Sequence, residues 1–204
     1  MTGRWSLILL VAANLLPLAG VFLWDWDVFL LLLLFWCENV IIGLFGIARL
    51  VVAATNDTLR EGLFLPLFFL VHYGGFMFGH FMVLFGMYSG SFEAFGNPTQ
   101  PEDYYRLILD NLNWVAVAAL FISHGWSFIE NYMGGNEYER LSPMQAMGLP
   151  YKRMFITHIA LILGGFFLIK NGQPLVGLII LVLMKIALDI VFHQKEHRKL
   201  GVVG

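Results

Sequence analysis

The chain has 204 residues, of which 59% are hydrophobic and only 13% are charged, and its formal net charge is -2. Ordinary soluble domains carry roughly 25% charged residues, so this composition excludes a typical water-soluble fold and indicates an integral membrane protein. Nucleic-acid binding requires a basic face, so we expect no nucleic-acid partner. The single cysteine, Cys37, excludes an intramolecular disulfide within this sequence.

Six apolar stretches are long enough to cross a bilayer as α-helices, which takes about 20 residues each. Turn-forming residues such as Asn, Gly and Pro separate them, and we expect the first stretch to be a retained helix rather than a cleaved signal peptide. Residues 1–204 are therefore expected to form a single transmembrane domain, an all-α bundle of six helices. The expected spans are approximately 5–23, 28–52, 63–87, 113–132, 154–170 and 175–193.

Positive charge is distributed unevenly between the two ends of this predicted bundle. If the N-terminus is cytoplasmic, nine Lys and Arg residues fall on the cytoplasmic side, whereas only Arg106 and Lys170 fall on the outer side. The positive-inside rule then predicts that both termini are cytoplasmic. Membrane lipid is the expected surrounding partner.

The second span carries Glu38 near its middle, next to Asn39. A carboxyl group in hydrocarbon costs several kcal/mol unless it is paired, so a functional role is the default expectation. Glu38 would suit a general base, a proton carrier or a metal ligand. The alternative is a neutral Glu38 that hydrogen-bonds to a neighbouring helix.

The third span contains two histidines separated by eight residues, His72 and His80. They lie about 12 Å apart along a helix, so they cannot share one ion. We expect His72 to belong to the functional site and His80 to lie near the outer interface without a special role. Gly75 and Gly79 form a small-xxx-small pair, which predicts close helix packing and, as an extension, a homo-oligomer.

The fourth and fifth spans each supply one candidate histidine, His124 and His158. At a rise of 1.5 Å per residue, Glu38, His72 and His124 lie roughly 12 to 21 Å from the cytoplasmic end of their spans. His158 lies within roughly 10 Å of that end. This layering predicts a cavity that opens toward the cytoplasmic side.

The sixth span places Lys185, Asp189 and His193 at positions i, i+4 and i+8 on one helix face. A carboxylate and an imidazole one turn apart can chelate a metal ion, as in known helical metal sites. Equally, Lys185 and Asp189 could form an ion pair that neutralises two buried charges, with His193 at the level of the lipid headgroups. The sequence leaves both alternatives open.

Together these motifs show that nearly the whole chain resembles a family of prokaryotic six-helix membrane proteins catalogued as a domain of unknown function. The motifs that carry the resemblance are Glu38-Asn39, His72-Tyr73-Gly74, Ser123-His124, Asn131-Tyr132, Pro150-Tyr151-Lys152-Arg153, His158 and the Lys185, Asp189, His193 series. The resemblance supports the topology and a multi-pass location in the cell inner membrane, but it implies no activity. A weaker chemical similarity links the chain to the ceramidase and adipose-receptor membrane hydrolases, which bind zinc through histidines.

The leading hypothesis is an intramembrane metal site that serves a metal-dependent hydrolase. Glu38 would act as the catalytic general base or as a further ligand. Imidazole and carboxylate ligands favour a divalent ion, zinc or iron, which would activate water. The expected metal ligands are His72, His124, His158, Asp189 and His193.

Two further hypotheses come from different functional classes. A proton-coupled or ion transporter would use Glu38, His72, Lys185 and Asp189 as a relay. A structural or partner-binding membrane protein would use the polar residues only to join helices.

Overall fold

The structure, a computed structural model, describes residues 15, 17–54, 59–88, 101–135, 141–171, 175–176 and 178–187. Within these residues the chain is built of helices and short turns, without a β-strand. The predicted all-α class is therefore confirmed.

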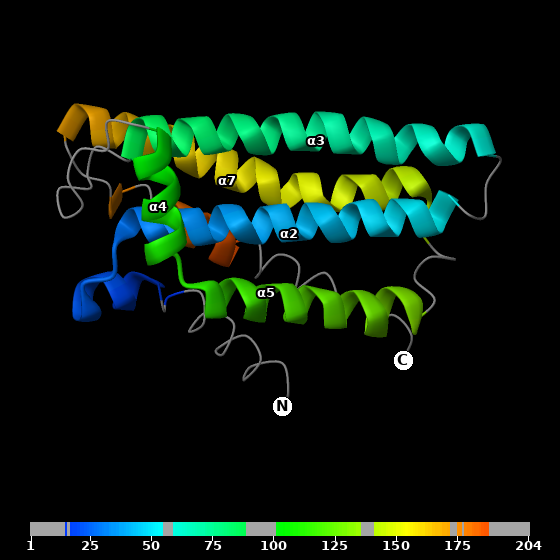
Figure 1. Ribbon diagram of the computed structural model, residues 1–204, viewed down its shortest axis with the longest axis horizontal. Helices are drawn as coiled ribbons and strands as arrows, with labels where there is room; N and C mark the ends of the chain where they lie inside the picture. Colours follow the sequence, from blue (N-terminus) through cyan, green and yellow to red (C-terminus); the bar gives the residue numbers. More distant parts are fainter. Residues whose placement is uncertain are drawn as a thin grey trace.

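Four long helical segments lie side by side and form the body of the molecule (Figure 1). Their bounds are α2 (Val28–Ala54), α3 (Leu59–Tyr88), α5 (Trp114–Ser127), which continues as the π-helix η3 (Phe128–Met133), and α7 (Pro143–Asn171). α2 is central because it packs against α3, α5 and α7. Residues 17–24 and 178–187 are also helical.

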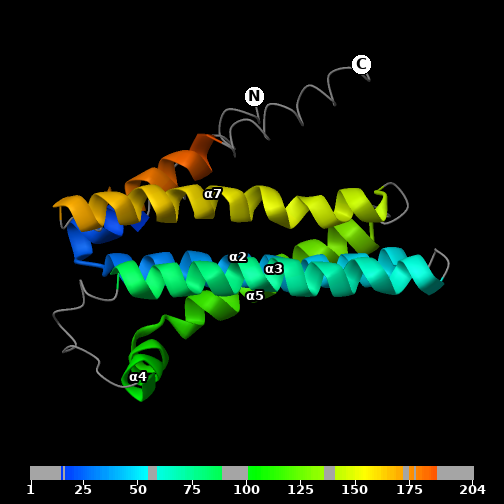
Figure 2. The same cartoon turned by 90° about the horizontal axis from the view of Figure 1, so that it is seen from above.

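A shorter helix, α4 (Pro101–Asn111), runs across the direction of the long helices at the end where α5 begins (Figures 1 and 2). The six expected spans do not include α4, because it lies in the proline-containing segment between the third and fourth spans. Proline is nevertheless favoured at the first position of a helix, where no backbone N–H is needed.

Two clusters of buried apolar side chains hold the long helices together. One cluster joins Phe29 and Leu33 of α2 to Leu84 of α3 and to Leu178 and Val182 of the last described helix. The second lies further along α2, and its members are Leu50, Phe69, Tyr73, Met77, Ala146 and Met154. The described part of the sixth expected span is thus packed into the same core as α2.

Small residues on α2 allow its neighbours to approach closely. A Cβ at Gly43 would lie 2.4 Å from the Tyr73 ring of α3, and a Cβ at Gly46 would lie 2.9 Å from the ring of Pro150 in α7. By contrast, a Cβ at Gly75 or Gly79 would meet no atom within 4 Å. The Gly75 and Gly79 pair therefore does not pack against another described helix of this chain, and its role in a homo-oligomer stays a prediction.

Two described helices are long and apolar enough to cross a membrane, Val28–Ala53 and Phe64–Gly86, within the second and third expected spans. Trp114–Glu130 and Leu178–Ala187 are shorter apolar helices. α7 begins at Pro143, eleven residues before the start of the fifth expected span at 154. The six-helix topology and the cytoplasmic position of the termini stay predictions.

Candidate functional site

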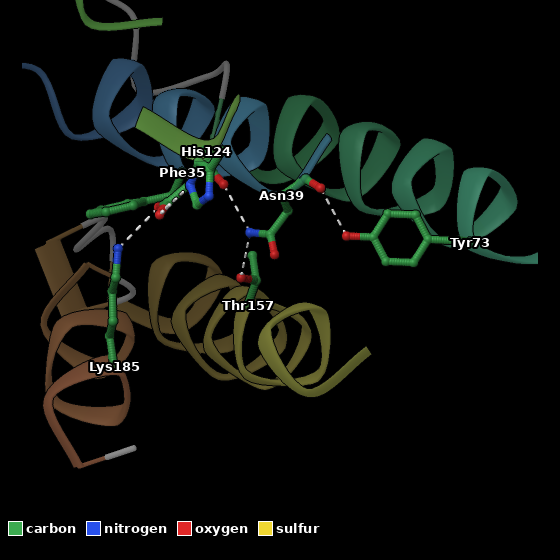
Figure 3. Close-up of polar contacts among 7 residues, drawn as sticks. Phe35, Asn39, Tyr73, His124, Thr157 and Lys185 are labelled. Atoms are coloured by element: carbon green, nitrogen blue, oxygen red, sulfur yellow. Dashed lines mark hydrogen bonds and ion pairs between the residues drawn. The ribbon is translucent and has the colours of Figure 1, made fainter. Parts of the chain in front are cut away.

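Glu38 lies between two basic side chains that come from two other helices. Its Oε2 atom is 3.0 Å from Nζ of Lys185, and its Oε1 atom is 3.6 Å from Nε2 of His124. The Glu38 side chain is only 12% exposed, and those of His124 and Lys185 are 24% and 31% exposed. Figure 3 shows Lys185 and His124 on separate helices.

The charges within this group of three, here named the Glu38 cluster, depend on protonation. Lys185 provides a positive charge that offsets the Glu38 carboxylate, and its Nζ atom also lies 4.9 Å from the centroid of the Phe35 ring. That distance falls within the range of a cation–π contact. His124 adds a second positive charge beside the carboxylate only when its ring is protonated.

A hydrogen-bond network next to the Glu38 cluster ties three helices together. The Asn39 amide donates to the Phe35 carbonyl at 2.9 Å and to Oγ1 of Thr157 in α7 at 3.0 Å. The Tyr73 hydroxyl of α3 donates to the Asn39 carbonyl at 2.8 Å (Figure 3). Asn39 is 5% exposed, and its Oδ1 atom is buried without a hydrogen-bond partner. This network holds the backbone around Glu38 in place.

His72 lies on the α3 face that meets α7, away from the Glu38 cluster. Its Nδ1 atom is 2.8 Å from the hydroxyl of Tyr151. The imidazole ring stacks on Phe68 and contacts the ring of Phe76. His72 is solvent-accessible in this chain, so its position is that of a surface histidine bonded to a tyrosine.

His80 and His158 contact each other between α3 and α7. Nε2 of His80 lies 2.5 Å from Nδ1 of His158, and the ring centroids are 4.7 Å apart. His80 is 3% exposed, and its second nitrogen, Nδ1, is buried without a partner. His72, His80 and His158 all lie against the ring of Phe76.

Three of the five predicted metal ligands lie within the described residues, and each of them contacts a different partner. His72 contacts Tyr151, His124 contacts Glu38, and His158 contacts His80. Across the described ranges no group of three or more His, Cys, Asp or Glu residues could hold a metal ion. The other two predicted ligands, Asp189 and His193, lie outside the described residues.

The helix boundaries and the packing explain this outcome. The fifth expected span starts at 154, but α7 begins at Pro143, so His158 lies in the middle of the helix. There it meets His80, for which the sequence predicts no special role. Lys185 contacts Glu38, and Asp189, its suggested partner, lies outside the described residues.

The sequence did not predict two contacts of the candidate residues, for different reasons. Tyr151 belongs to the Pro150-Tyr151-Lys152-Arg153 motif, and nothing in the sequence connects it to His72. The contact between Glu38 and Lys185 joins residues 147 positions apart, yet their shared position inside apolar stretches was a usable signal, since opposite buried charges tend to pair.

The family of unknown function DUF6498 matches residues 1–201, and the chain therefore belongs to this family. No curated protein matches the chain, and no solved structure matches it. The family match agrees with the resemblance to a domain of unknown function, whereas the likeness to the ceramidase group gains no support from these comparisons.

Proposed function

We propose that this member of the DUF6498 family is a multi-pass protein of the cell inner membrane in which the Glu38 cluster binds protons and drives proton-coupled or ion transport. The observation that carries the proposal is the contact of one shielded carboxylate with an ammonium and an imidazole from two other helices. Ionisable residues inside membrane segments commonly mark ion pathways and proton relays.

The distribution of exposed apolar side chains supports the membrane location. In the apolar segments of α2 and α3, only 39% and 28% of the residues are buried inside the protein. A core helix of a soluble protein would be mostly buried. Val71 of α3 and Val115 of α5 are 75% and 81% exposed, which is favourable when the surrounding medium is lipid.

The arrangement of the helices supports the proposed topology. Successive long helices run in opposite directions, so that the start of α2 and the end of α3 lie at the same end of the bundle (Figure 1). The exposed side chains of Trp24 and Trp26 lie just before α2 at that end, as expected of an interfacial aromatic belt. Six helices with both termini cytoplasmic complete this topology.

Proton binding in the cluster follows from competition for one carboxylate. When His124 is neutral, the Glu38 carboxylate and the Lys185 ammonium balance each other. When His124 is protonated, the Glu38 carboxylate faces two cations, His124 and Lys185. Its attraction to each of them then differs from its attraction to Lys185 alone. Proton uptake thereby changes the strength of the links from α2 to α5 and to the helix at 178–187, and such a change couples protonation to helix movement.

We do not propose a metal-dependent hydrolase, because no group of three or more potential metal ligands lies close together among the described residues. Glu38 has Lys185 at 3.0 Å, and this ammonium occupies the place where a metal cation would otherwise approach the carboxylate. The described contacts fit a binding site for protons better than a site for zinc or iron.

The test is proton flux into liposomes that contain the purified protein, measured with an internal pH-sensitive dye under an imposed potential. We expect Glu38→Gln to abolish the flux because the neutral amide offers no negative charge for Lys185 and a protonated His124 to share. Glu130→Gln is the matched control, since Glu130 is exposed and accepts a hydrogen bond from the Trp126 indole. Flux in wild type that Glu38→Gln leaves unchanged, or no flux in wild type, would overturn the proposal.

A charge exchange separates function from folding. The double variant Glu38→Lys with Lys185→Glu retains an ion pair, so we expect it to recover much of the stability lost by either single variant. It moves the carboxylate away from His124, so we expect flux to stay low. Full recovery of flux would show that the cluster contributes only an ion pair.

A further inference from the structure

We propose that His80 and His158 form a second proton-binding site, in which a proton passes between α3 and α7 along an N–H···N hydrogen bond. This site lies outside the Glu38 cluster and would bind protons whatever the transported species. Only the flux measurement described below rests on the proposed function.

The geometry places two imidazole nitrogens on one line of transfer. Nε2 of His80 and Nδ1 of His158 are 2.5 Å apart, which is shorter than the usual N–H···O distance of about 2.9 Å. Because two bare lone pairs would repel each other, one of these nitrogens must carry the hydrogen. The contact is therefore a hydrogen bond with a single proton between the rings.

Burial determines which nitrogens exchange protons with their surroundings. Nδ1 of His80 is buried without a partner, whereas His158 is only partly buried. Protons therefore enter and leave the pair through His158, the less buried of the two rings.

The transfer balances as a relay through two rings. With the bridging hydrogen on Nδ1 of His158, a proton from water binds Nε2 of His158, the Nδ1–H bond of His158 breaks, and an Nε2–H bond forms on His80, whose Nδ1 already carries a hydrogen. The pair then holds one proton more than before. The reverse sequence releases that proton through His158 and restores both rings.

The surroundings of the pair suit transfer rather than permanent charge. Among the contacts described for the two rings, each meets the other and the ring of Phe76. The nearby ionisable groups of α2 and α5, Glu38 and His124, are directed to each other.

The neighbouring residues place the pair beside the Glu38 cluster. Thr157 precedes His158 in α7 and accepts a hydrogen bond from Asn39, which follows Glu38 in α2. A proton on either site therefore adds positive charge close to the other. The second site extends the polar path from α2 to the α3 and α7 contact.

The direct test is NMR of the wild-type protein with ¹⁵N-labelled histidines, in detergent or lipid. We expect a scalar coupling across the hydrogen bond between Nε2 of His80 and Nδ1 of His158, with a strongly deshielded proton between them. Absence of this coupling in folded wild type would overturn the proposal without any variant. Titration of the two rings as independent groups would overturn it as well.

Variants then assign the signal and its role. His80→Gln and His158→Gln should each remove the shared-proton signal, whereas the matched control His72→Gln should retain it, because His72 bonds to Tyr151 on the same pair of helices. In the samples of His80→Gln and His158→Gln, the signal of His72 reports whether α3 and α7 remain assembled. A shared-proton signal that persists in both pair variants would refute the assignment.

Flux distinguishes this proposal from the previous one. We expect His80→Gln to lower proton flux about tenfold or more, in line with the loss of one acid–base group. If wild type shows the shared proton but no flux, the transport function fails while the second binding site stands. If flux requires Glu38 but is unchanged in His80→Gln and His158→Gln, the relay through the pair is refuted.

Discussion

The ion pair between Glu38 and Lys185 offers the sharpest test of the energetic reasoning. Replacing Lys185 with Met removes the ammonium that lies 3.0 Å from the carboxylate while keeping most of the apolar stem. Breaking a buried ion pair by removing one partner costs about 3–5 kcal/mol. Lys185 is 31% exposed, so water already screens part of the interaction, and we expect a loss of about 2–3 kcal/mol.

The cation–π contact with Phe35 adds a smaller contribution. Nζ of Lys185 lies 4.9 Å from the Phe35 ring centroid, and contacts of this kind contribute about 0.5–1 kcal/mol at exposed sites. The double variant Glu38→Gln with Lys185→Met removes both charges, so it should be less destabilised than the sum of the single variants. We expect a coupling energy of about 2 kcal/mol between the two positions.

The measurement is equilibrium unfolding in mixed detergent micelles, followed by circular dichroism, for the four members of this double-mutant cycle. Lys170→Met is the matched control, because Lys170 is an exposed cation 5.9 Å from the Phe166 ring centroid and should change stability by less than about 0.5 kcal/mol. Additive effects within about 0.5 kcal/mol would show that Glu38 and Lys185 do not interact.

Two further predictions concern the packing of α3 on α2 and use the same unfolding measurement. Gly43→Ala should destabilise the protein by about 1–3 kcal/mol, because the new Cβ would lie 2.4 Å from the Tyr73 ring. A new Cβ at Gly75 would meet no atom within 4 Å, so Gly75→Ala should be neutral or stabilising. Equal effects of the two substitutions on stability would contradict the packing argument. Tyr73→Phe should cost about 1–2 kcal/mol, since it removes the hydroxyl that donates to the buried Asn39 carbonyl, and an unchanged stability would show that this bond contributes nothing.

The helices could be predicted because apolar length and turn residues act locally. α2 follows the predicted 28–52 stretch closely, and α5 with η3 follows 113–132. The expected span at 154–170 misses the start of α7, because Pro143 and the residues after it are less apolar than the rest of the helix. Hydropathy alone does not mark a helix that continues beyond an apolar stretch. α4 was not predicted for a similar reason, because its sequence mixes polar and apolar residues and is too short to cross a membrane.

The candidate site was predicted only as a set of residue types. Glu38, His124 and Lys185 were each singled out for being ionisable within apolar segments, and the structure brings these three together. His72 and His158 were singled out in the same way, and their described partners are Tyr151 and His80. Depth is a property of one helix, whereas facing depends on how each helix is rotated against its neighbours.

The amino-acid sequence by itself determined the all-α class, the positions of α2 and of α5 with η3, and which polar groups lie inside them, because hydropathy, helix length and charge are sums over neighbouring residues. Only the tertiary structure decided that Glu38 meets Lys185 and His124 and that His80 meets His158. Those pairings depend on helix rotation and offset, which are set by packing features such as the ring of Tyr73 against Gly43. Contacts between residues more than 70 positions apart in the sequence leave no periodic signal along the chain.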